Sequence, residues 1–132
     1  MIIKVAPDKE KARSMLGLIG NREKFLSMID TEKFPTIAAE TYYEIIKELS
    51  TALLLLDGFK TIGEKAHKEL IDYLSNYKEI SSEDMVLMDD LRIKRNKSSY
   101  EGKQIERSYL ENKKDKLMGI INKLKKLVNN RL

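Results

Sequence analysis

Apolar residues recur at intervals of three and four along most of this chain, which is the spacing of amphipathic helices. A first helix is predicted to begin at Pro7-Asp8, and its apolar stripe consists of Ala12, Met15, Leu16, Ile19, Leu26 and Ile29. The clearest pattern follows Pro35 and ends at Leu56, before Asp57-Gly58, where the glycine can cap the helix. Its apolar positions are Ile37, Tyr42, Ile45, Leu49, Ala52, Leu53 and Leu56, with Thr41 on the same face.

Three more helices are predicted in the second half of the chain. A short helix is expected from about Gly63 to Asn76-Tyr77, with an apolar stripe that contains His67, Leu70, Ile71 and Leu74. The run Ser81-Ser82-Glu83-Asp84 resembles a capping box that opens the next helix, because Ser81 and Asp84 can satisfy each other's backbone amides. A last helix is expected from about Lys103, with Leu110, Leu117, Ile121, Leu124 and Val128 on one stripe.

No segment shows the alternation of a half-buried strand, so the predicted fold class is all-α. We expect residues 1–132 to form a single domain, an antiparallel up-and-down bundle of four to five helices. The absence of cysteine excludes disulfides and sulfur-based metal sites. The short apolar run in MIIKVAPDK predicts no signal peptide, and ALLLL is too short to cross a membrane. A soluble, cytoplasmic protein is therefore expected.

The basic charge lies on one side of the chain. Residues 1–91 carry 12 Lys/Arg against 17 Asp/Glu, whereas residues 92–132 carry 13 against 4, so the net charges are −5 and +9. This asymmetry indicates an anionic partner for the C-terminal third, either nucleic acid or an acidic protein. The alternative is a lysine-rich helix face that is only solvated.

No metal or other cofactor is predicted. Glu83, Asp84, Asp89 and Asp90 could hold Mg²⁺, but acidic residues near a helix start ordinarily complement the helix dipole. His67 is the only histidine, so any histidine-dependent general base must use it. Its place on an apolar stripe favours a core histidine satisfied by a hydrogen bond.

An arginine occupies a position where the helical pattern calls for an apolar residue. Leu87, Met88 and Leu91 step at helical spacing, and Arg95 follows four residues after Leu91. Because arginine is almost never buried alone, Arg95 should snorkel at a helix end, pair with a carboxylate such as Asp57, or line a cleft that receives an anion. The neighbouring side chains, which suit an anion site, are Arg92, Asn96, Lys97, Ser98, Ser99 and Tyr100.

The stretch RNKSSYEG, residues 95–102, resembles the motif of the HEPN superfamily of small helical proteins. That motif is an arginine, often followed by asparagine, and a histidine after four to six residues; here Tyr100 occupies the histidine position. Together with LLLLDGFKTIGEKAHKELIDYL and DDLRIKRNKSSYEG, it is similar to prokaryotic HEPN proteins encoded beside minimal nucleotidyltransferases. The resemblance covers about residues 36–130.

The resemblance implies a function in RNA binding or RNA cleavage. Many HEPN proteins are metal-independent ribonucleases of toxin-antitoxin and defence systems, and they dimerise so that two motifs face one cleft. On this basis Arg95 would bind the scissile phosphate, Asn96 would orient it, and Tyr100 would stand at the proton-handling position. Arg92, Lys97 and Ser99 would add to the anion site around Arg95.

A non-catalytic alternative follows from the same residues. A tyrosine with a pKa near 10 is a poor general base at neutral pH. The chain could therefore be a nucleotide- or RNA-binding module, or the partner of a minimal nucleotidyltransferase.

A homodimer is predicted from helix geometry as well. Residues five apart on an ideal helix differ by about 140° around the axis, so Arg95 and Tyr100 cannot face one ligand unless the helix breaks. A two-fold axis near this stretch would relax the constraint and place two Arg95 side chains about one anion.

Overall fold

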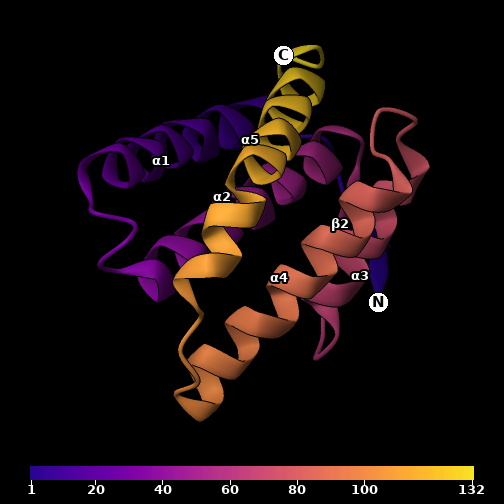
Figure 1. The fold of residues 1–132 in the computed structure, drawn as a ribbon. Helices are drawn as coiled ribbons and strands as arrows, with labels where there is room; N and C mark the ends of the chain where they lie inside the picture. Colours follow the sequence, from indigo (N-terminus) through magenta and orange to yellow (C-terminus); the bar gives the residue numbers. More distant parts are fainter.

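The computed structural model describes residues 1–132, and five helices account for most of them (Figure 1). Along the chain the elements are β1 (Ile2–Lys4), α1 (Lys9–Met28), α2 (Pro35–Leu56), β2 (Phe59–Thr61), α3 (Ala66–Tyr73), a 3₁₀ turn (Leu74–Asn76), α4 (Ser82–Glu101) and α5 (Arg107–Asn129). The prediction of a mainly helical bundle is confirmed. No helix combines the length and the apolar composition needed to cross a bilayer.

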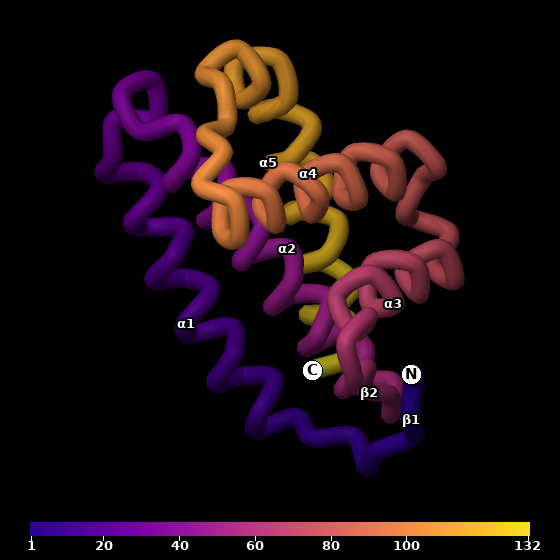
Figure 2. Tube along the Cα trace, turned by 90° about the horizontal axis from the view of Figure 1, so that it is seen from below, coloured from indigo at the N-terminus to yellow at the C-terminus, as the bar shows by residue number.

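Helix α2 is the central element of the bundle. It packs against α1, α3, α4, α5 and β2, and in Figure 2 it runs between α1 and α3. Eleven of its residues are buried, because apolar side chains cover most of its circumference. A helix of this kind is stable only when other elements cover it on several sides.

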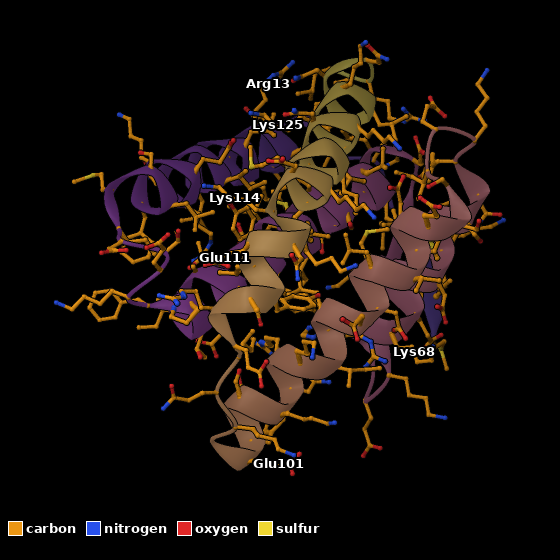
Figure 3. All side chains as sticks on the ribbon, viewed as in Figure 1. Arg13, Lys68, Glu101, Glu111, Lys114 and Lys125 are labelled. Atoms are coloured by element: carbon orange, nitrogen blue, oxygen red, sulfur yellow. The ribbon has the colours of Figure 1, made fainter.

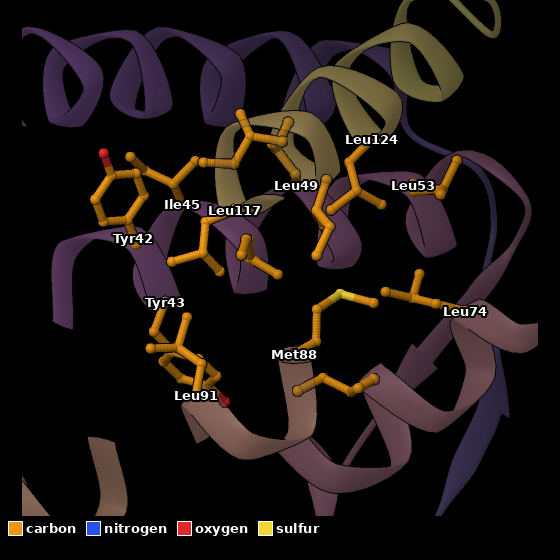
Figure 4. Packing of buried hydrophobic residues seen from close by; sticks show 14 of the residues in the cluster. Tyr42, Tyr43, Ile45, Leu49, Leu53, Leu74, Met88, Leu91, Leu117 and Leu124 are labelled. Carbon is orange, nitrogen blue, oxygen red and sulfur yellow. The ribbon is translucent and has the colours of Figure 1, made fainter. Parts of the chain in front are cut away.

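The core is one cluster of 28 buried hydrophobic residues drawn from all five helices. In its centre, Leu49 and Leu53 of α2 lie among side chains of α4, α5 and the 3₁₀ turn, namely Leu74, Met88, Leu91, Leu117 and Leu124 (Figure 4). The apolar stripes predicted for the fourth and fifth helices are therefore confirmed as core positions.

The helix boundaries follow local capping chemistry. Asp8 accepts a hydrogen bond from the backbone amide of Lys11 at the start of α1, and Ser81 and Asp84 form the predicted capping box of α4. Helix α4 ends at Gly102, whose φ of 67° lies in the left-handed region. The start of α1 and the capping box of α4 agree with the predictions.

Helix α5 begins later than predicted, at Arg107 instead of about Lys103. The preceding residues form a connector between α4 and α5 in which Ile105 is buried. The backbone amide of Ile105 donates a hydrogen bond to the Thr36 hydroxyl (2.8 Å), which anchors the connector to the first turn of α2. This contact with a distant segment takes the place of a further turn of helix.

The expectation of no strands was wrong in one place. β1 and β2 pair antiparallel, with Ile3 opposite Lys60. The backbone amide of Val5 continues the ladder by donating to the carbonyl of Gly58 (2.9 Å). Each strand has three residues, which is too short for alternation to be recognised in the sequence.

Alanine substitutions at two glycines with positive φ test whether close packing constrains the turn between α2 and β2. Gly58 has φ 87°, and a Cβ there would lie 3.3 Å from the Val5 carbonyl oxygen; Gly102 has φ 67° and open space around it. Gly102→Ala should cost about 1 kcal/mol through backbone conformation alone. Gly58→Ala should cost about 2 kcal/mol or more, because close contact adds to the strain. Urea denaturation measures both values, and equal losses would contradict this account of the turn.

Candidate functional site

The RNKSSYEG stretch is helical through Glu101, without a break between Arg95 and Tyr100. Its side chains therefore point in different directions around α4. Arg95 and Ser98 face α2, Arg92, Asn96 and Tyr100 line a pocket shared with α3, and Lys97 faces the start of α5. Ser99 is exposed and lines none of these surfaces. The predicted site residues do not converge on one point.

Arg95 pairs with a carboxylate, which was one of the three alternatives, and that carboxylate belongs to Glu44. Its guanidinium donates to Glu44 Oε1 of α2 at 3.1 Å, and the side chain is 19% exposed. The guanidinium carbon also lies 5.4 Å from the centre of the Tyr43 ring. Arg95 therefore joins α4 to α2.

Asp57, named in the sequence analysis as one possible partner of Arg95, binds other residues. Its carboxylate accepts hydrogen bonds from the Tyr77 hydroxyl and from Arg131 Nε, both at 2.7 Å. Asp57 thus joins the end of α2 to the turn after α3 and to the end of α5. Of the three alternatives for Arg95, the structure shows pairing with a carboxylate, but the partner is Glu44 and not Asp57, because the partner of a core-edge arginine depends on packing between distant segments.

Glu44 is held as a carboxylate by the cations around it. Burial alone would raise its pKa, but the hydrogen bond and charge of Lys47, together with the charge of Arg95, outweigh that effect, so its pKa is lowered. Lys47 Nζ lies 2.8 Å from Glu44 Oε2. Ser98 makes a similar contact one turn away, because its hydroxyl donates to Glu40 at 2.9 Å. These contacts form a polar seam between α2 and α4.

A pocket of about 430 Å³ opens between α4 and the start of α3. Arg92, Asn96 and Tyr100 line one wall at intervals of four residues, which places them on one side of α4. The other wall consists of Gly63, Glu64, Lys65, Ala66, His67 and Lys68. In Figure 3, Lys68 projects beside α4 on this side of the molecule. The pocket thus joins three of the predicted site residues to the only histidine.

His67 is exposed, so the prediction of a core histidine was wrong. It lies in the first turn of α3, at the edge of the core, and the buried part of the stripe begins at Leu70. Its ring centre is 6.3 Å from that of Tyr43. Partial burial, followed by the positive charges of Lys47 and Arg95, lowers the pKa of His67, so the imidazole is neutral at pH 7. A neutral imidazole can both donate and accept hydrogen bonds in the pocket.

His67 also lines a second, smaller opening of about 170 Å³, together with Lys47 and Lys60. The histidine is therefore surrounded by cations on both sides. Tyr43 lies beneath this surface and is 1% exposed, and its hydroxyl has no hydrogen-bond partner. Burial, opposed by the charges of Arg95 and Arg92, raises the pKa of Tyr43 to about 12, so it stays a phenol.

The site as a whole is suited to an anion with several hydrogen-bond acceptors. Arg92 supplies a guanidinium, although it also donates to Asp89 at 2.9 Å. The Asn96 amide, the Tyr100 phenol and the His67 imidazole add neutral donors. No three carboxylate or imidazole groups are arranged so that they could hold a metal ion.

Comparison with models of protein families, with curated proteins and with solved structures returned no match. The resemblance to the HEPN superfamily therefore stays a prediction from the motif residues.

The electrostatics of the pocket can be tested on His67, whose single imidazole gives an unambiguous NMR signal. Its pKa should lie below 6.5, and Lys47→Gln should move it upward by removing a neighbouring positive charge. Lys24→Gln on α1 removes a charge that does not act on His67 and should leave the pKa unchanged. A pKa at or above the ordinary value would contradict the described surroundings.

The same shift has a consequence for stability. Because the folded pKa is lowered, the folded state binds fewer protons than the unfolded state, and the free energy of unfolding should decrease as the pH falls below about 6.5. His67→Gln should flatten this part of the stability profile.

Proposed function

We propose that the protein is HEPN-like and binds RNA, with a phosphate held in the α3–α4 pocket. One observation carries the proposal: Arg92, Asn96 and Tyr100 share one opening with His67. A phosphodiester needs a cation and several donors at short range, and these side chains provide them. Tyr100 is 80% exposed, so its ring is free to stack against an unpaired base.

The charge distribution and the family resemblance support the same proposal. The residues of α4 that line the pocket belong to the basic third of the chain, which begins at Arg92. The other wall, at the start of α3, adds Lys65 and Lys68. The proposal includes an antiparallel, HEPN-like order of the helices. A role in a toxin-antitoxin or defence system, and a minimal nucleotidyltransferase as partner, belong to it through the resemblance alone.

Arg95 has a positioning role in this proposal. Its guanidinium is engaged by Glu44 and faces the interior of its own chain. It therefore holds α4 in the orientation that turns Arg92, Asn96 and Tyr100 toward α3. An anion between two copies of Arg95, as expected from the sequence, is not part of the proposal.

The proposed dimer uses the outer face of α4. Val86 and Ile93 are 71% and 40% exposed, and their spacing of seven residues places them on one line along the helix. If two α4 helices pair antiparallel about a two-fold axis at Ile93, the two Ile93 side chains meet at the centre of the interface.

Cleavage is the second candidate function, and His67 is the observation that favours it. A neutral imidazole beside Arg92 could accept the proton of a ribose 2′-hydroxyl while the guanidinium holds the phosphate. The 2′-oxygen would then bond to phosphorus, the bond from phosphorus to the 5′-oxygen would break, and the imidazolium would return the proton to that leaving oxygen. Tyr100 would then not need to act as the base. This candidate assigns the proton transfer to a residue of α3 instead of the motif.

RNA binding can be measured by fluorescence anisotropy with a labelled single-stranded RNA. Arg92→Gln should weaken binding about tenfold, because one charge-assisted contact to phosphate is lost. Affinity should also fall steeply with added salt. Arg13→Gln is the matched control, since Arg13 is exposed on α1, has no ion-pair partner and lies on the opposite side from Lys68 (Figure 3). Equal losses in the two variants would show that the RNA senses only net charge.

Incubation of the same RNA in the presence of EDTA separates binding from cleavage. For a binding module the RNA should stay intact. Fragments that disappear in His67→Ala and persist in Arg13→Gln would instead establish a metal-independent ribonuclease.

Light scattering tests the dimer. The protein should have twice the mass of the 15.3 kDa chain at micromolar concentration, and Ile93→Glu should return it to a monomer by placing a charge at the centre of the interface. Leu18→Glu is the control, because Leu18 is 48% exposed on α1 and lies outside the proposed interface. A monomeric wild-type protein would refute the α4 interface.

A further inference from the structure

Part of the positive charge of residues 92–132 is neutralised by ion pairs within the fold. Of the 13 Lys/Arg residues in this range, six pair with carboxylates, namely Arg92, Arg95, Arg107, Lys123, Lys125 and Arg131. The seven that remain are all lysines: Lys94, Lys97, Lys103, Lys113, Lys114, Lys116 and Lys126. The positive charge available to an external partner is therefore much more localised than the sequence indicates.

Four of these seven lysines surround one pocket. It has a volume of about 430 Å³ and lies where α4 ends and α5 begins, and the lysines that line it are Lys94, Lys97, Lys103 and Lys113. The other polar groups in its wall are Gln104, Glu106, Ser108, Tyr109 and Asn112. Four ammonium groups thus face a single carboxylate, that of Glu106.

The backbone holds these lysines close together. The left-handed turn at Gly102 reverses the chain, and the amide of Lys103 then donates to the carbonyl of Lys97 at 3.2 Å. The buried Ile105, anchored to Thr36, fixes the connector that follows. The ammonium of Lys94 also lies 4.9 Å from the centre of the Tyr109 ring. The fold therefore maintains a concentration of like charges that repel one another.

We propose that this pocket binds a compact oligophosphate, the triphosphate group of a nucleotide. A triphosphate carries enough negative charge to offset the four ammonium groups, and lysine binds phosphate as a point charge without a fixed geometry. The volume is in the range of small-ligand sites. The Tyr109 ring and the Asn112 amide lie in the same wall and are available to the nucleoside.

The site is distinct from the proposed RNA site. The two pockets lie on different sides of α4 and share no residue. Nucleotide binding here neither requires RNA binding nor follows from it.

Isothermal titration calorimetry with sodium tripolyphosphate and with ATP, both in EDTA, tests the site. The double variant Lys97→Gln/Lys103→Gln should bind both ligands at least about tenfold more weakly, because it removes two of the four charges. Lys78→Gln/Lys126→Gln is the matched control, since it also removes two exposed, unpaired lysines, neither of which lines the pocket. AMP, with a single phosphate, should bind much more weakly than ATP.

Several outcomes would overturn the proposal. These are no binding of tripolyphosphate at millimolar concentration, equal weakening in the control variant, or AMP binding as tightly as ATP. Thermal melting shows whether both double variants are folded, which we expect because the substituted side chains are exposed and make no ion pairs. Arg92→Gln should keep its affinity for tripolyphosphate, so a failure of the RNA proposal is distinguished from a failure of this one.

Discussion

The need to bury α2 on several sides determines most of this structure. Its apolar residues extend around the helix instead of forming one stripe, so no single neighbour can cover them. Helices α1, α4 and α5 cover its length, and α3 with β2 covers its C-terminal part. Since burial of apolar area is the main favourable term in folding, the arrangement of the other helices follows from that of α2.

The polar residues of α2 then decide how the covering helices are oriented. Glu40, Glu44 and Glu48 recur at intervals of four along the remaining stripe, and each binds a partner on a neighbouring helix. Arg22 of α1 binds Glu48, whereas Ser98 and Arg95 of α4 bind the other two. An ion pair of this kind contributes little to stability by itself. It does select one rotation of α4, and that rotation places the neutral polar side chains toward α3.

Features with local causes could be predicted from the sequence. The bounds of α2 and the capping box at Ser81 both depend on neighbouring residues, and both were predicted. The features that were missed depend on distant segments: the pairing of β1 with β2, the late start of α5, and the partner of Arg95. His67 was misplaced because it precedes Leu70, Ile71 and Leu74 at helical spacing, and only packing shows that the buried part of the stripe begins at Leu70. The sequence therefore predicted only some of the residues of the candidate site.

The carboxylate of Asp57 bears on the order in which contacts form during folding. Its bond to Tyr77 spans 20 residues and its bond to Arg131 spans 74. The entropic cost of loop closure grows with the length of the loop, so the nearer contact can form while α5 is still unattached. The first half of the fold then presents an acceptor that is already in place when the end of α5 arrives. In the folded state the same arrangement lets the last turn of α5 fray without leaving Asp57 unpartnered, because the Tyr77 hydroxyl continues to donate to it.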